Sequence, residues 1–361
     1  MITVTQPFLP PKNEYEELLE QLWISKFITN NGEYVQKLEK ELVKLLNIRN
    51  LRYVTNGTLA LQVAIKALDL KGEIITTPFS FIATTTTIIW EKCCPVYVDV
   101  DPLTLCIDPK KIENAITKDT SAILATHVFG IPCDVEKIEA IAKKHNLKVI
   151  YDGAHAFGVK YKGHSIFNYG DISTYSFHAT KTFHTIEGGG ITCVNKELEN
   201  KVELLRSYGY VGEEFYLPGI NAKATEFHAA MGICNLKYIE ENLKKRKKIS
   251  EHYNSMLPKE IQVIHIDKNV VYNYAYYPIL LKDEDLLLRV VKELQRKEIQ
   301  SRRYFNPSLN KIPYLSNDYD CPISESVSKR ILCLPLYADL DLDIVKSIAI
   351  TINSVVEGEG K

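Results

Sequence analysis

Short runs of β-branched and other apolar residues alternate with longer amphipathic segments over the first 200 residues of the chain. This alternation predicts βαβ units, and therefore an α/β domain with a mainly parallel sheet. The apolar runs predict strands at 51–55, 73–76, 95–98, 121–126, 147–151, 171–177 and 190–194. The amphipathic segments predict helices at 58–69, 81–91, 109–116 and 134–145, the last two with Asp108 and Asp134 as N-caps.

The highly charged segment 238–257 predicts a long helix that leads from this region into a smaller domain. With 361 residues, the chain exceeds the roughly 250–300 residues over which one hydrophobic core keeps growing. We therefore expect two domains, a large one at 1–245 and a small one at 246–361. The basic run at 244–248 is more typical of a solvated helix face than of a binding patch.

The overall composition excludes several classes of protein. The formal net charge is −1, which gives no electrostatic basis for binding nucleic acid or an anionic membrane. The start of the chain lacks the pattern of a signal peptide, and no apolar run is long enough to span a membrane, so we expect a cytoplasmic protein. The eight cysteines have no metal-binding spacing, which favours buried free thiols and no metal.

Ligands of open α/β sheets bind beyond the carboxyl ends of the strands, and three places there carry candidate chemistry. In the first, Gly57 and Thr58 follow a predicted strand and begin a helix. Glycine allows a ligand to approach the backbone, and a helix N-terminus favours a phosphate. A turn with Thr58 as the N-cap explains the same residues equally well.

The other two places hold an acid and a lysine. Asp152 ends a strongly apolar strand, where a carboxylate needs a partner; it either caps a turn or pairs with a protonated heterocyclic nitrogen. Lys181 lies between two apolar strands in a Gly-rich connection. It is either a surface-loop lysine or a desolvated amine whose lowered pKa makes it a better nucleophile.

A phosphate-binding turn, an acid and then a lysine, in that order, form the pyridoxal-phosphate (PLP) set of the aspartate-aminotransferase fold. The chain resembles the DegT/DnrJ/EryC1/StrS family of sugar aminotransferases almost from end to end. The resemblance is carried by NGTLALQVAIKAL, TTPFSFIAT, PVYVDVDPLTLCIDPKKIENAIT, VIYDGAHAFG, GDISTYSFHATKTFHTIEGGGI and GINAKATEFHAAMG. It implies the type I PLP fold, with a mixed, mainly parallel sheet in the large domain and a smaller α+β C-terminal domain.

The resemblance also implies roles for single residues. Lys181 matches the lysine that forms the Schiff base with PLP and acts as general acid and base, and Asp152 matches the acid on the pyridine nitrogen. The other matching residues are His155 near the ring hydroxyl, Phe81 against the ring face, Gly57, Thr58 and Ser176 around the phosphate, and Asn221, which reaches the cofactor phosphate of the neighbouring subunit. A homodimer with composite active sites is therefore expected.

The expected reaction moves an amino group from L-glutamate to a nucleotide-linked keto-deoxy sugar for surface-polysaccharide or related glycan biosynthesis. The segment TKTFHTIEGGG resembles enzymes that convert dTDP-4-keto-6-deoxyglucose to dTDP-4-amino-4,6-dideoxyglucose. A 3-aminotransferase, a UDP- or GDP-sugar aminotransferase and a non-catalytic PLP-binding regulatory protein remain alternatives. Predicted substrate contacts are His184 and Glu187 at the entrance, and Arg302, Arg303, Tyr304 and Phe305 in the small domain, where a surface loop is the alternative.

Overall fold

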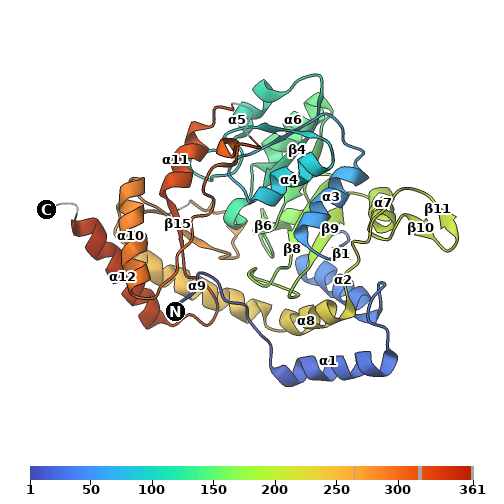
Figure 1. Ribbon diagram of the computed structural model, residues 1–361, viewed down its shortest axis with the longest axis horizontal. Helices are drawn as coiled ribbons and strands as arrows, with labels where there is room; N and C mark the ends of the chain where they lie inside the picture. Colours follow the sequence, from blue (N-terminus) through green and yellow to red (C-terminus); the bar gives the residue numbers. More distant parts are fainter. Residues whose placement is uncertain (264, 316–318, 359–361) are drawn as a thin grey trace.

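In the computed structural model, which describes residues 1–263, 265–315 and 319–358, a seven-stranded sheet forms the centre of the large domain (Figure 1). Its strand order is β1-β9-β8-β5-β4-β2-β3. The five strands from β8 to β3 run parallel, whereas β9 is antiparallel to both of its neighbours. The strands are β1 (Arg52–Val54), β2 (Glu73–Thr76), β3 (Cys94–Tyr97), β4 (Thr120–Thr126), β5 (Lys148–Asp152), β8 (Ile172–Ser176) and β9 (Gly189–Cys193).

Helices cover both faces of this sheet, because alternate residues of the strands bury apolar side chains on opposite faces. Ile74 belongs to the core under α3 and α7, whereas its neighbour Ile75 belongs to the core on the other face. The helices of this half are α1 (Lys12–Ser25), α2 (Glu33–Leu46), α3 (Gly57–Ala67), α4 (Ile82–Trp90), α5 (Pro109–Ile112), α6 (Val135–His145), α7 (Lys196–Arg206) and α8 (Glu226–Leu236).

The pattern-based elements are confirmed with only small differences at their ends. Each of the seven predicted strands is present, and Asp108 and Asp134 cap their helices by accepting hydrogen bonds from the amides of Lys110 and Lys137. The predicted helix at 109–116 is a single α-turn followed by a 3₁₀ turn at Glu113–Ala115. The N-cap of α3 is Asn56 rather than Thr58, since Asn56 Oδ1 accepts from the amide of Leu59.

The C-terminal part of the chain builds a second, smaller layer of sheet and helices. An antiparallel sheet of order β12-β14-β15 packs against three helices around its own apolar core. The three helices are α9 (Ile239–Met256), α10 (Glu284–Arg296) and α12 (Leu342–Glu357), and the strands are β12 (Gln262–Val263), β14 (Tyr277–Leu280) and β15 (Ile331–Leu334). A fourth helix, α11 (Pro322–Arg330), leads into β15. Helix α9 runs continuously through residues 245 and 246, so the domain boundary between them stays a proposal within a single helix.

Two small antiparallel sheets complete the fold of the described residues. The hairpin of β10 (Tyr210–Val211) and β11 (Glu214–Phe215) projects from the large domain beside α7 (Figure 1). Strands β6 (Lys160–Tyr161) and β7 (His164–Ser165) pair with each other, and β13 (Val270–Val271) joins them at β6. Within the described residues, no helix combines the length and the apolar character needed to cross a lipid bilayer.

One prediction about α9 is wrong in part. The basic run at 244–248 is not entirely a solvated face, because Arg246 is buried. Its guanidinium group donates to the backbone carbonyls of Tyr274 (2.9 Å) and Ala275 (2.6 Å). Five consecutive positions of a helix cover more than one full turn, so one of them has to face the protein interior.

Candidate active site

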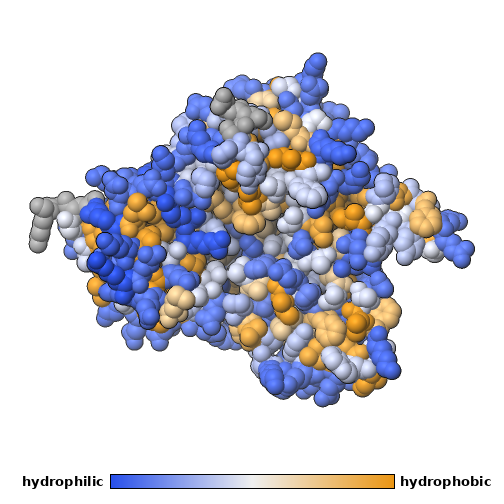
Figure 2. All heavy atoms as spheres, viewed as in Figure 1, coloured by the Kyte–Doolittle hydropathy of each residue, from blue (hydrophilic) through white to orange (hydrophobic). Residues whose placement is uncertain are grey.

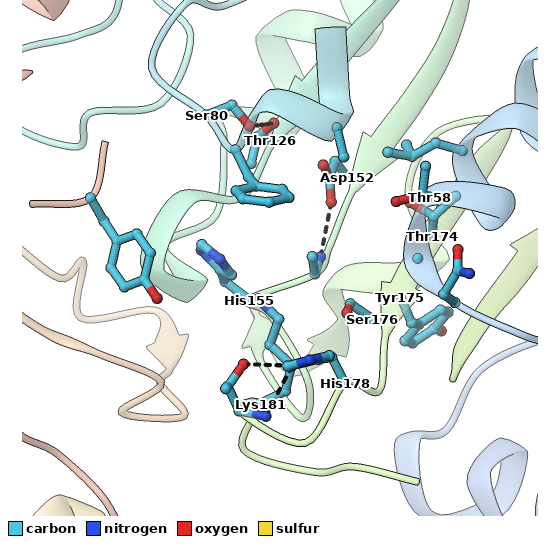
Figure 3. A pocket seen from close by; sticks show the side chains of 18 of the residues that line it. Thr58, Ser80, Thr126, Asp152, His155, Thr174, Tyr175, Ser176, His178 and Lys181 are labelled. Atoms are coloured by element: carbon cyan, nitrogen blue, oxygen red, sulfur yellow. Dashed lines mark hydrogen bonds between the residues drawn. The ribbon is translucent and has the colours of Figure 1, made fainter. Parts of the chain in front are cut away.

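A cavity of about 280 Å³ lies beyond the carboxyl ends of β5 and β8, where the C-terminal part of the chain meets the large domain. Side chains from several elements point into it (Figure 3). The structure brings together most of the predicted site residues, separated by up to 248 positions in the sequence. The predicted residues that line the cavity are Gly57, Thr58, Phe81, Asp152, His155, Ser176, Lys181, Glu187, Arg302, Tyr304 and Phe305.

Asp152 ends β5, and its carboxylate group is buried. Its Oδ2 accepts a 2.8 Å hydrogen bond from the hydroxyl of Thr84, and its Oδ1 accepts a 3.1 Å bond from the amide of Ala154. Burial raises the pKa of Asp152, while these two bonds and the positive charge of Lys181 act in the opposite direction. A buried carboxylate with such partners favours a further cationic neighbour on the cavity side.

Lys181 lies in the connection between β8 and β9. Burial lowers the pKa of its ammonium group to about 8; the charge of Asp152 opposes this change and that of Arg302 adds to it. Near neutral pH the amine therefore gives up its proton more readily than an exposed lysine, as a nucleophile or a base must. Its Nζ forms a 3.3 Å hydrogen bond with the hydroxyl of Tyr276.

His155 presents a neutral ring to the cavity. Burial, together with the positive charge of Lys181, holds its pKa well below the usual value. Its Nδ1 accepts a 3.1 Å hydrogen bond from the amide of Phe129, so the ring proton lies on Nε2 and is available to an acceptor. The imidazole stacks on Phe305 with ring centres 6.0 Å apart, and this contact fixes its plane.

The opposite side of the cavity suits a phosphate group. Helix α3 begins at Gly57, and the first amides of a helix have no acceptor within the helix. Ser176 ends β8 beside them, and a Cβ atom on Gly57 would lie 3.0 Å from the Cβ of Ser176. A larger residue at this position would therefore push the helix start and the strand apart. Thr58 adds a hydroxyl group from the same turn of α3.

Phe81 and the small-domain residues close the remaining sides. Phe81 is the N-cap residue of α4, and half of its side chain is exposed to the cavity and solvent. Arg302 lies over the ring of Tyr304, with 4.6 Å between the guanidinium carbon and the ring centre. Glu187 stands 3.4 Å from His178, which also lines the cavity.

Three predicted site residues lie elsewhere. His184 does not border the entrance: it is buried, with its Nε2 2.7 Å from the backbone oxygen of Phe8. Arg303 does not line the cavity, because its partly buried side chain pairs with Glu284 at 2.6 Å and lies against the end of α11. Asn221 is exposed and is not part of the cavity of its own chain.

Sequence reasoning missed several residues of the site. Tyr276 reaches Lys181 from the C-terminal part of the chain, and Thr84 holds Asp152 from within α4. Ser80 extends this hydrogen-bonded group, since its hydroxyl lies 2.7 Å from that of Thr84 and 3.0 Å from that of Thr126. The four consecutive threonines at 84–87, unusual in an otherwise apolar helix, were the one available signal.

The chemistry of the cavity points to an organic cofactor. The part of the chain that the structure describes holds no group of three or more His, Cys, Asp or Glu residues able to bind a metal ion. The residues present do fit PLP: an amine of lowered pKa, a buried acid, a histidine donor and a helix N-terminus surround one cavity. The buried carboxylate of Asp152 in particular fits a protonated ring nitrogen.

Solved structures place this fold among sugar aminotransferases. The structure of DesI in the presence of its TDP-sugar product matches with a TM-score of 0.94 and 27% sequence identity, over 99% of this chain and 93% of that one. The fold therefore defines a PLP-dependent enzyme of the aspartate-aminotransferase type.

Sequence comparison defines the family of this enzyme more narrowly than the fold does. The profile of the DegT/DnrJ/EryC1/StrS aminotransferase family matches residues 11–353, so the chain belongs to this family of PLP-dependent sugar aminotransferases. It is 42% identical to a dTDP-4-amino-4,6-dideoxy-D-glucose transaminase of Shigella dysenteriae, over 98% of this chain and 99% of the relative. It is 33% identical to a GDP-perosamine synthase of Escherichia coli O157:H7, over 98% of each chain.

Proposed function

We propose that this aminotransferase transfers the amino group of L-glutamate to dTDP-4-keto-6-deoxyglucose and releases dTDP-4-amino-4,6-dideoxyglucose. The observation that carries the proposal is the 42% identity, along nearly the whole chain, to a transaminase named for that product. The similarity to DesI, solved with a TDP-sugar product, supports a dTDP-linked acceptor. The product would serve the synthesis of a surface polysaccharide or a related glycan.

In this proposal, the large domain holds the cofactor. The helix start at Gly57, with Thr58 and Ser176, binds the phosphate, and Phe81 covers one face of the ring. The carboxylate of Asp152 keeps a proton on the ring nitrogen, and Nε2 of His155 donates to the ring hydroxyl. Bound PLP supplies an electron sink for negative charge that develops at the amine-bearing carbon.

Lys181 moves the proton. Its amine takes the proton from the α-carbon of glutamate and later delivers a proton to the amine-bearing carbon of the sugar. An amine with a pKa of about 8 is suited to both steps, because it loses and regains a proton near neutral pH more easily than an exposed lysine does. Arg302, Tyr304 and Phe305 form the wall of the small domain, where a diphosphate and a sugar ring would be recognised.

We also propose a homodimer with composite sites. Large apolar side chains are exposed on α1 and its following loop and on the β10–β11 hairpin, including Trp23 (67% exposed), Ile24 (73%) and Phe215 (82%). Figure 2 shows apolar side chains gathered on the part of the surface formed by α1 and its surroundings. Exposed apolar surface of this kind is typical of an interaction site.

The cytoplasmic location expected from the sequence stays a prediction.

The segment that carries Asn221 is held firmly at the surface. The backbone oxygen of Ala222 accepts hydrogen bonds from the amide and the hydroxyl of Thr55, both 2.9 Å long. Asn221 itself pairs with Ser207 through a backbone bridge. Its side chain is therefore presented outward from a fixed backbone, as the contact with a partner's phosphate requires.

The acceptor is tested by incubating the purified enzyme and glutamate with dTDP-4-keto-6-deoxyglucose, with the matching 3-keto sugar, and with UDP- and GDP-linked keto sugars. We expect the 4-amino dTDP sugar to form fastest, with the position of the amine determined by NMR. A 3-amino product, or a preference for the UDP- or GDP-linked acceptor, would overturn the assignment of the substrate. The similarity to a GDP-perosamine synthase makes the GDP-linked acceptor the comparison that matters most.

A further inference from the structure

The hydroxyl group of Tyr276 lies 3.3 Å from Nζ of Lys181, although the two residues are 95 positions apart in the sequence. Tyr276 precedes β14 and is almost completely buried. Within the described part of the chain, this is the one hydrogen bond formed by the amine of Lys181. The contact therefore joins the reactive amine of the large domain to the C-terminal part of the chain.

We propose that Tyr276 is a catalytic residue, whose hydroxyl group binds the ε-amino group of Lys181 whenever that amine is free of the cofactor, in either protonation state. The proposal rests on the function proposed above for Lys181, but it does not depend on which sugar accepts the amino group.

The chemistry of the phenol suits this task. An ammonium group has only donors, whereas a neutral amine also has a lone pair that accepts. The hydroxyl of Tyr276 can accept a hydrogen bond from the ammonium group of Lys181 and donate one to the neutral amine. Burial raises the pKa of Tyr276, so the phenol keeps its proton throughout the pH range in which Lys181 changes charge. A phenylalanine at this position would fill nearly the same space but could neither accept a hydrogen bond from the ammonium group nor donate one to the amine.

The segment around Tyr276 is held from two sides. The buried guanidinium of Arg246 in α9 binds the carbonyl groups of Tyr274 and Ala275. Asn273 accepts from the amide of Ala275 at 3.2 Å, and its Nδ2 donates to the carbonyl of His155 at 2.8 Å. The backbone that carries Tyr276 is therefore fixed to α9 and to the loop that follows β5.

Ring packing fixes the side chain itself. The ring of Tyr276 lies 4.6 Å from that of His155 and 5.4 Å, edge to face, from that of Tyr304. These contacts leave the hydroxyl group directed at Lys181. Its place is thus set by packing that exists before any ligand binds, as preorganised catalysis requires.

Other charged and titratable groups also face Lys181, and they bear on its titration. Asp152 from β5 raises the pKa of the amine, and Arg302 lowers it. His155 is neutral and carries its proton toward the cavity. Further titratable groups that line the cavity are Tyr175, His178, Glu187 and Tyr304. The variants below leave all of them in place.

The test compares Tyr276→Phe with Tyr272→Phe. Tyr272 belongs to the same segment, and its hydroxyl donates a 2.9 Å hydrogen bond to the carbonyl of Phe129, outside the cavity. Each variant thus loses one partly buried hydrogen bond of a tyrosine hydroxyl, and thermal unfolding checks that both fold. The titration of Lys181 is measured in the pyridoxamine-phosphate form by competitive acetylation at several pH values, followed by peptide mass spectrometry.

We expect the pKa of Lys181 to fall by about one unit in Tyr276→Phe, because the charge-assisted hydrogen bond of the ammonium group is stronger than the bond of the neutral amine, so its loss costs the charged form more. The pKa should stay unchanged in Tyr272→Phe. In the donor half-reaction, kcat should fall about tenfold in Tyr276→Phe, with little change in KM for glutamate. An unchanged titration of Lys181 would overturn the contact, and a full-speed half-reaction would overturn its catalytic role. If borohydride reduction fails to attach the cofactor to Lys181, the underlying function is wrong instead.

Discussion

Thr84 and Asp152 are joined by a 2.8 Å hydrogen bond, in which the threonine hydroxyl donates to the buried carboxylate. Thr84 lies in α4, and its hydroxyl is itself 2.7 Å from that of Ser80. The acid at the end of β5 is thus held by a hydroxyl of α4, which is itself linked to the hydroxyl of Ser80 just before that helix. This arrangement orients the carboxylate and opposes the effect of burial on its pKa.

Replacing Asp152 by alanine should leave the cofactor able to bind Lys181 but slow the donor half-reaction by about 100-fold or more, because the ring nitrogen loses the group that keeps it protonated. Stopped-flow spectroscopy with glutamate measures the rate. The milder change Thr84→Val keeps the acid and should slow the reaction much less. A rate near that of the unchanged enzyme in Asp152→Ala would remove Asp152 from the mechanism.

Borohydride reduction of the purified enzyme should attach a pyridoxyl group to Lys181. The amine is placed in the cavity and has a pKa of about 8, whereas exposed lysines keep more of their protons at the same pH. Peptide mass spectrometry identifies the labelled residue. A label on a different lysine, or none at all, would sink the assignment.

Adjacent arginines offer a matched pair of variants. Arg302→Ala should lower kcat/KM for the nucleotide sugar about tenfold or more, since a charged contact at the cavity wall is lost. Arg303→Ala should leave these constants almost unchanged and reduce stability by about 1 kcal/mol, because it loses a partly exposed ion pair with Glu284 outside the cavity. Steady-state kinetics and thermal unfolding separate the two effects, and equal kinetic losses would contradict the structure.

Composite sites can be tested by mixing subunits. Lys181→Ala and Asn221→Ala should each be nearly inactive alone, but a heterodimer contains one site that is free of both changes. After exchange of subunits, verified by native mass spectrometry, activity should therefore reappear. If heterodimers form and no activity returns, Asn221 does not serve its partner's site.

His127 should make the protein sensitive to acid. Burial lowers the pKa of this histidine to about 3, whereas in the unfolded chain it is close to 6.5. Between these values the unfolded state binds a proton that the folded state does not, so the free energy of unfolding falls as the pH falls, by about 1.4 kcal/mol per pH unit from this residue.

The contribution of His127 to the pH dependence of the free energy of unfolding is obtained by comparing a variant with the unchanged protein. His127→Asn keeps an acceptor for the amide of Cys133, which now bonds to Nδ1 of His127 at 3.0 Å, and removes the titration. Denaturant unfolding at several pH values should show a shallower pH dependence in this variant. Replacing the exposed His164 by Asn is the control. Parallel curves for His127→Asn and the unchanged protein would refute the prediction.

The sequence predicts the elements of the large domain well because its strands are short apolar runs and its helices have clear caps. It also predicts Asp152 and Lys181, since both follow apolar strands and so lie at one edge of the sheet. Tyr276 carries no such mark. Its side chain reaches Lys181 only because the C-terminal part packs against the large domain, and a sequence pattern does not report packing between distant segments.

Two further errors have a common physical reason. Arg302 pairs with Cys333 as in a β-bridge, so its neighbours alternate in direction: Arg302 and Tyr304 line the cavity, and Arg303 points away. In the same way, His184 lies near Lys181 in sequence but turns toward the N-terminal segment. Position along a loop tells which residues are close to a site, and only the backbone conformation tells which of them face it.

The cavity is assembled from two stretches of chain with different tasks. Residues up to Lys181 and Glu187 supply the groups proposed to bind the cofactor, and residues from Tyr276 to Phe305 supply the opposite wall. Most of the groups proposed for the chemistry common to every transamination thus lie in the first stretch, Tyr276 being the exception, and the residues proposed to meet the sugar lie in the second. Substitutions of Arg302, Tyr304 or Phe305 should therefore alter the choice of acceptor while Lys181, Asp152 and Tyr276 stay in place.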